Sequence, residues 1–256
     1  MPRPLLRAGA VGVVLVAGCA LRGPRVEVRP ATVDELLGAL TARRAALTSL
    51  RARAQVRTGL ARLWTREAIV VQRPNDVRID VLSPFGLALA LGTDGSVLWA
   101  YPPAEGTRYE GPATPANLAR FLGTPVAVGD LADILLGLPP PRVAVDPPRL
   151  ELTRERRWRV TLPLESGLQS LWFAGDTHDL LATEEARRGV VVLRVAFGDY
   201  REGFPHLLEV AAPGTSSTAT LAYEAVEPNA RVDAALFAPP PAARVLPLDA
   251  AALEAR

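Results

Sequence analysis

Apolar and polar residues alternate with a period of two over most of this chain, and this pattern restricts the fold more than any other feature of the sequence. Residues 77–81 read Val-Arg-Ile-Asp-Val, which is typical of a strand with one buried face. Comparable runs occur at 54–60, 69–71, 150–152, 158–162, 168–173, 190–197, 207–210 and 218–223. Asp94-Gly95 lies between the apolar segments 87–91 and 97–101 and predicts a tight hairpin. We therefore expect an antiparallel sheet.

One helical pattern precedes the predicted strands, and two short ones lie between them. A Thr-x-x-Glu capping box at 32–35 begins an amphipathic pattern that predicts a helix over about 33–50. Thr-Pro begins a second, short helical pattern at 114–122. A third runs from about 130 to 138 and stops at the three prolines 139–141. The predicted fold class is α+β: one curved antiparallel sheet, an N-terminal amphipathic helix and a short helical insertion.

The first eighteen residues have the three parts of an export signal. Arg3 and Arg7 form the charged start, residues 11–16 are apolar, and Ala17-Gly18 come directly before Cys19. The apolar run is much shorter than the roughly 20 residues that a helix needs to cross a bilayer, so we expect a cleaved signal. An ordinary secretory signal with an incidental cysteine is the alternative.

Cys19 is the only cysteine, so no intramolecular disulfide is possible. Val-Ala-Gly-Cys at 16–19 resembles the lipobox of bacterial lipoproteins, whose cysteine carries the acyl chains that anchor the protein to a membrane. In those lipoproteins an Asp after the cysteine favours the inner membrane. Ala20 therefore implies the outer membrane, with the protein lipid-anchored on its periplasmic face. We expect a signal peptide at 1–18, a lipidated tether at 19–31 and a single domain at 32–256.

The net charge of +2 disappears once the signal is removed. Residues 1–18 contain two of the 29 basic side chains and none of the 27 acidic ones, so the mature chain is balanced. No net field remains to attract phosphates, and we predict no nucleic-acid partner.

The sequence contains no catalytic or nucleotide-binding motif of the Gly-x-Ser-x-Gly, Gly-x-Gly-x-x-Gly or Walker type. His178 and His206 lack the spacing of metal ligands, and 176–179 is interpreted as a polar turn. The carboxylates within 184–188 are interpreted as part of a charged, solvated loop. We predict no enzyme, no cofactor and no metal. The surplus of aliphatic residues fits either a packed core or an apolar cavity between sheet and helices.

One long stretch of the sequence has a familiar order of motifs. Val81–Leu91, then Gly-Thr-Asp-Gly at 92–95 and the segment 118–139, resembles the LolB family of outer-membrane lipoprotein receptors over about residues 32–140. Residues 204–210 and 229–240 are similar to endings in the wider LolA/LolB-like superfamily. LolB proteins proper are shorter and lack the latter ending.

This resemblance implies an unclosed β-barrel whose concave face encloses acyl chains of lipoproteins or phospholipid. We expect this cavity to be lined by Leu36, Leu40, Val56, Val81, Phe121 and Ile134. It also implies a loop that enters the membrane, here Pro84, Phe85, Gly86 and Leu87, with Phe85 in place of the family's Leu. The Phe85 ring either has a target outside the protein or folds back onto the core.

The predicted function is that of a monomeric, non-enzymatic lipoprotein. It would accept lipoproteins from a periplasmic LolA-type carrier and insert them at the outer membrane, by exchanging acyl chains between apolar environments. A second hypothesis is a structural or accessory lipoprotein of a secretion or polysaccharide assembly, which a filled core would favour. A third, a hydrolase, lacks a recognisable nucleophile and base.

Overall fold

A computed structural model describes residues 27–59, 64–215 and 217–250, so the predicted signal peptide and Cys19 lie outside the described residues. Within these residues, fourteen strands form one sheet in the order β14-β6-β5-β4-β3-β2-β1-β13-β12-β11-β10-β9-β8-β7. The strands are β1 (Ser49–Thr58), β2 (Thr65–Gln72), β3 (Asp76–Ser83), β4 (Gly86–Thr93), β5 (Val97–Tyr101), β6 (Thr107–Pro112), β7 (Arg149–Leu152), β8 (Arg157–Leu164), β9 (Gly167–Ala174), β10 (Leu180–Arg187), β11 (Val190–Arg201), β12 (Phe204–Ala212), β13 (Ser217–Pro228) and β14 (Arg244–Pro247). The helices are α1 (Val33–Ala46), α2 (Pro115–Leu122) and α3 (Val128–Leu135), with 3-10 turns η1 (Pro103–Glu105), η2 (Pro213–Thr215), η3 (Ala234–Phe237) and η4 (Leu248–Ala250).

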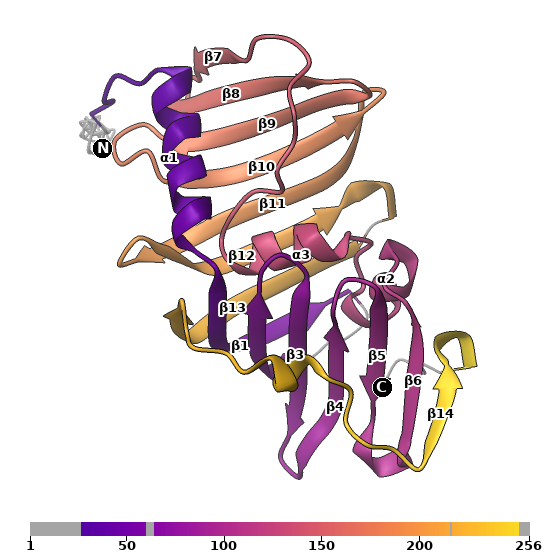
Figure 1. Cartoon of the computed structure of the whole chain (residues 1–256). Coiled ribbons are helices and arrows are strands. Elements are labelled where there is room, and N and C mark those ends of the chain that lie inside the picture. The colour runs from indigo at the N-terminus through magenta and orange to yellow at the C-terminus, as the bar shows by residue number, and fades with distance from the viewer. Residues whose placement is uncertain (1–26, 60–63, 216, 251–256) are drawn as a thin grey trace, which may run out of the picture.

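The sheet is strongly curved and remains open (Figure 1). Neighbouring strands are antiparallel except β14, which pairs in parallel with β6. The edge strands β7 and β14 do not pair with each other. The three helices lie on the concave side, and their apolar residues join those of the sheet in one continuous core. This arrangement confirms the predicted fold class.

Alternation along each strand places the core on the concave face. Leu50, Ile69, Val160 and Val195 come from four different strands and are completely buried. The predicted hairpin at Asp94-Gly95 is also confirmed, since β4 and β5 pair with Ala90 opposite Tyr101. Local turn chemistry and strand period were therefore sufficient to place these elements.

The prediction for the end of the first helix was wrong. The helix ends at Ala46, Leu47 is already extended, and Leu50 belongs to β1 together with Arg51. A distant residue sets this boundary: the Asn229 side chain donates to the Ala46 carbonyl (2.8 Å) and accepts from the Thr48 amide (2.9 Å). The helical period of the leucines could not reveal that contact.

The prediction of a solvated loop at 184–188 was also wrong. Residues Leu180–Arg187 form β10, a strand between β9 and β11. Its inward positions include Thr183 and Glu185, which are 2% and 5% exposed. Polar residues on the buried face hide the period of two, so alternation could not identify this strand.

The C-terminal segment runs as a strap along the sheet and ends beside β6 (Figure 1). The Trp99 indole is buried and donates to the Phe237 carbonyl at 3.0 Å. Gly92 makes room for this indole, because a Cβ on Gly92 would lie 2.2 Å from the Trp99 ring. The strap therefore holds the β3–β6 half of the sheet from the outside.

Candidate functional site

Helix α2 has local signals at both ends that fix it as a short, separate element. The Thr114 hydroxyl accepts from the Asn117 amide (3.2 Å), and Pro115 occupies the first helical turn. Gly123 ends the helix in the left-handed region, with φ of 71°. Its apolar face carries Leu118, Phe121 and Leu122.

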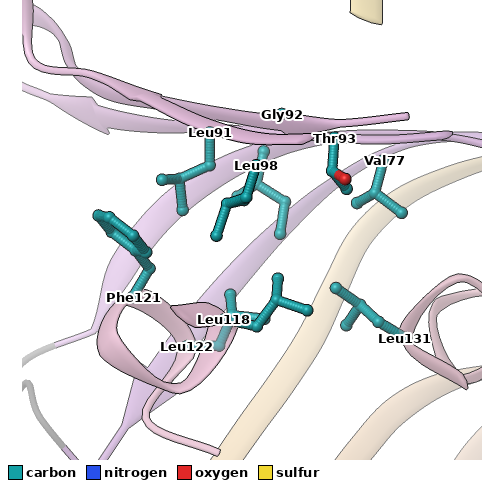
Figure 2. Close-up of a pocket in the computed structure, with 10 residues that line it drawn as sticks. Val77, Leu91, Gly92, Thr93, Leu98, Leu118, Phe121, Leu122 and Leu131 are labelled. Carbon is teal, nitrogen blue, oxygen red and sulfur yellow. The ribbon is translucent and has the colours of Figure 1, made fainter. Parts of the chain in front are cut away.

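An apolar cleft lies between this face of α2 and the concave side of β3, β4 and β5 (Figure 2). Its lining residues are Val77, Ile79, Leu91, Gly92, Thr93, Leu98, Leu118, Phe121, Leu122 and Leu131. The space, with its open mouth included, is about 270 Å³. Much of this space is open to solvent, so the cleft is narrow and side chains fill most of the concave face.

The structure distributes the six predicted cavity residues over different environments. Phe121 lines the cleft. Leu36, Val56 and Ile134 are buried in the packed core, and Leu40 packs half-buried against it. Val81 is half-buried on β3, opposite Glu67 of β2. Sequence reasoning missed most of the actual lining, although the period of two at 77–81 already carried the signal for Val77 and Ile79.

Helix α3 is held by a buried ion-pair cluster that the sequence analysis did not predict. The Asp133 carboxylate is 2.6 Å from Arg44 Nη1 of α1 and 3.3 Å from Arg73 Nε, the latter contact without hydrogen-bond geometry. Arg44 also donates to the Pro139 carbonyl. The Tyr223 hydroxyl donates to the Leu135 carbonyl at 2.8 Å, and burial raises the pKa of this phenol. These contacts fix α3 between α1 and the sheet.

A second cluster fixes the segment that follows α3. The Arg142 guanidinium donates to both oxygens of Asp130 (3.0 and 2.7 Å) and to Glu185 of β10 (2.7 Å). Burial acts to raise the pKa of Glu185, but the hydrogen bonds and charges of Arg142 and Arg187 outweigh it, and the pKa falls below its ordinary value. Gln169 adds a hydrogen bond to the Pro140 carbonyl at 2.9 Å.

Glu67 is an acidic side chain on the apolar, concave side of β2. Its register partners are Ala54 on β1 and Val81 on β3. Burial raises the pKa of Glu67 to about 7, although the Thr65 hydroxyl donates to it at 3.1 Å and acts in the opposite direction. Near neutral pH this carboxyl is partly protonated, which lessens the cost of its apolar position.

The β3–β4 turn projects from the end of the sheet, at the lower end of β3 and β4 in Figure 1. The Ser83 hydroxyl donates to the Gly86 carbonyl and accepts from the Phe85 amide, which closes the turn. The Phe85 side chain is 99% exposed, and Leu87 is 37% exposed. Pro84 and Gly86 are exposed as well. The ring therefore does not fold back onto the core.

The described residues contain no cluster of three or more His, Cys, Asp or Glu side chains with the geometry of a metal site. His178 lies in the polar turn after β9, and its ring is 3.4 Å from the Arg29 carbonyl. His206 is 3.4 Å from the Tyr223 carbonyl. None of the helices in the described ranges is long and apolar enough to cross a membrane.

Comparisons with known proteins support the fold. No protein-family model matches the chain, and no curated protein sequence matches it. Among solved structures, a LolA superfamily protein from Nitrosomonas europaea is similar with a TM-score of 0.53 and 12% identity, over 82% of this chain and 99% of that one. An outer-membrane lipoprotein-sorting protein domain from Vibrio parahaemolyticus has a TM-score of 0.52 and 14% identity, over 79% of this chain and 94% of that one. A DUF1329 family protein from Desulfovibrio piger has a TM-score of 0.50 and 12% identity, over 79% of this chain and 94% of that one. At these identities the likeness establishes a shared LolA-like open-barrel fold.

Proposed function

We propose that this protein is a non-enzymatic lipoprotein that binds acyl chains under α2 and transfers lipoproteins to the outer membrane, in the manner of a LolB-type receptor. The observation that carries the proposal is the pairing of an apolar cleft on the concave face with a fully exposed Phe85 at the tip of the same half of the sheet. The shared fold with lipoprotein-sorting and LolA superfamily proteins supports it.

Acyl chains would enter by displacing α2 from β3–β5. The contacts across the cleft are apolar, so a chain can replace the side chains of α2 without leaving a buried polar group unpaired. Helix α3, in contrast, is tied to α1 by the Asp133–Arg44 ion pair and to β10 by Arg142, which bridges Asp130 and Glu185, and it stays in place. Binding and release then require no covalent step and no nucleotide.

The position of the tether adds a geometric condition. The Arg29 backbone is bonded to Gly175 and to the Trp158 indole, at the β9 end of the sheet. Strand β9 lies seven positions from β3 in the sheet order, about 34 Å along the sheet at about 4.8 Å per strand. The tether and the Phe85 turn would therefore reach the membrane from different parts of the sheet.

A charge in the cleft should prevent acyl-chain binding. In the mature chain carrying Cys19→Ser, Phe121→Asp should weaken binding of a fluorescent fatty acid at least tenfold, because the carboxylate would lie among apolar side chains and the acyl chain. Fluorescence titration measures this. Ala116→Asp, an exposed position on the same helix, is the matched control and should bind normally. Equal affinity of both variants and the parent would contradict the cleft as the binding site.

The anchor itself is tested at Cys19. We expect Cys19→Ala to abolish acylation and to move the protein from the membrane fraction to the periplasm or to an uncleaved precursor. Mass spectrometry of the wild-type mature N-terminus should show a multiply acylated cysteine. A mature N-terminus without lipid would refute the anchor while leaving the cleft hypothesis intact.

The narrowness of the cleft favours a second candidate function, a scaffolding lipoprotein of an envelope assembly. Such a protein would use the same fold with a filled core and would not take up the fatty-acid probe. The titration of the parent protein therefore separates the two functions.

A further inference from the structure

Paired residues of β1–β4 form one row across the sheet, just inside the β3–β4 turn. In the strand register Gln55 lies opposite Arg66, Arg66 opposite Leu82, and Leu82 opposite Leu87. Directly opposite residues of antiparallel strands point to the same side of a sheet. Arg66 is exposed, and Leu82 is 40% exposed. Arg66 and Leu82 therefore share this edge of the convex face, and Leu87 lies beside them across the bulge that shifts the register between Val81 and Leu82.

One aromatic residue at this end, Trp64, lies next to a further arginine. The Arg57 guanidinium sits over the Trp64 ring, 5.1 Å from its centroid, and Trp64 is 45% exposed. With Phe85 at the tip, four large apolar side chains are exposed at one end of four adjacent strands. We call Trp64, Leu82, Phe85 and Leu87 the apolar tip.

Among the described residues, three arginines on the same convex face form no ion pair with an acidic side chain. Arg53 and Arg57 alternate along β1 with buried Ala54 and Val56, and both are exposed, as is Arg66. The ion pairs found in the described part of the chain include none of these three. Glu224 on β13 instead accepts a hydrogen bond from Gln55 at 2.8 Å. Their guanidinium groups are available to an external anion.

We propose that this end of the convex face docks on an anionic phospholipid bilayer, with the apolar tip in the interface and Arg53, Arg57 and Arg66 on lipid phosphates. The proposal deepens the proposed function, on which it rests, by naming the lipid surface that the tip selects. Guanidinium groups bind phosphate oxygens in a forked geometry, and Trp favours the membrane–water interface. Because the mature chain has equal numbers of basic and acidic side chains, its net charge does not attract an anionic membrane. The attraction would come from the local cluster of these three arginines.

The test uses the mature chain with Cys19→Ser, so that no lipid anchor contributes to binding. Co-sedimentation is measured with vesicles of phosphatidylcholine alone and of phosphatidylcholine with phosphatidylglycerol. Each arginine near an anionic surface strengthens binding about fivefold, so R53Q/R57Q/R66Q should weaken binding to the anionic vesicles about a hundredfold. Binding to pure phosphatidylcholine should change little, and the corresponding triple Lys variant should keep most of the anionic selectivity.

The matched control is R154Q/R157Q/R188Q, which removes the same charge from exposed positions on the other half of the sheet. It should bind anionic vesicles like the parent. Equal losses in both triple variants, or an unchanged affinity in the first, would overturn the proposal; thermal unfolding of each variant shows that the fold is kept. Fatty-acid uptake is measured in parallel: its failure in the parent would refute the proposed function, whereas selective vesicle binding would still support this docking surface.

Discussion

Phe85→Glu should reduce transfer of a bound lipoprotein to liposomes by at least tenfold while leaving the free energy of unfolding unchanged within about 0.5 kcal/mol. The ring is 99% exposed, so the fold gains nothing from it. Burying a phenyl side chain in the bilayer interface contributes on the order of 1.5–3 kcal/mol, which the charged residue forfeits. Transfer is measured with an acylated substrate in liposome flotation, and stability by urea unfolding.

Two variants make this result specific. Val143→Glu changes another strongly exposed apolar residue, 87% exposed in the segment between α3 and β7, and should transfer normally. Phe85→Leu keeps an apolar tip and should retain most of the transfer. Fatty-acid uptake should be the same in all three proteins. If Phe85→Glu lost stability and uptake together with transfer, Phe85 would be a structural residue and the insertion hypothesis would lose its support.

Features set by neighbouring residues could be predicted from the sequence, and features set by distant contacts could not. The Asp94-Gly95 hairpin and the cap of α2 depend on a few adjacent residues, and both were placed correctly. The end of α1 depends on a contact with Asn229. Strand β10 can carry Glu185 on its buried face because Arg142, 43 positions away in the sequence, donates a hydrogen bond to that carboxylate. Periodicity contains no information on such partners.

In the candidate site, too, some features could be predicted from the sequence and others depend on distant contacts. Sequence pattern separates inward from outward positions on β3, but it does not say which inward residues face α2 and which are covered by other side chains. Leu36, Val56 and Ile134 are apolar and inward, yet they pack into the core, whereas Leu91 and Leu98 line the cleft. Exposure of Phe85 likewise depends on the projection of the turn, because proline and glycine predict a turn but not where its side chain points.

The buried cluster around Asp133 gives the largest expected effect on stability. Asp133→Asn should lower the free energy of unfolding by about 3 kcal/mol. The carboxylate is 8% exposed and faces two guanidinium groups, Arg44 and Arg73, which would then lie half-buried without a counter-charge. We choose the lower end of the usual 3–5 kcal/mol because both arginines retain some solvent contact. Urea unfolding followed by circular dichroism measures the loss.

A matched substitution and a double variant separate this effect from a general loss of surface charge. Glu151→Gln breaks the exposed pair with Arg159 and should cost less than about 1 kcal/mol. Arg44→Gln with Asp133→Asn should lose clearly less than the sum of the two single variants, since one counter-charge is removed together with its partner. Additive losses would mean that the cluster does not couple α1 to α3. In that case α3 could move with α2, and the fixed frame that the proposed entry of acyl chains requires would be absent.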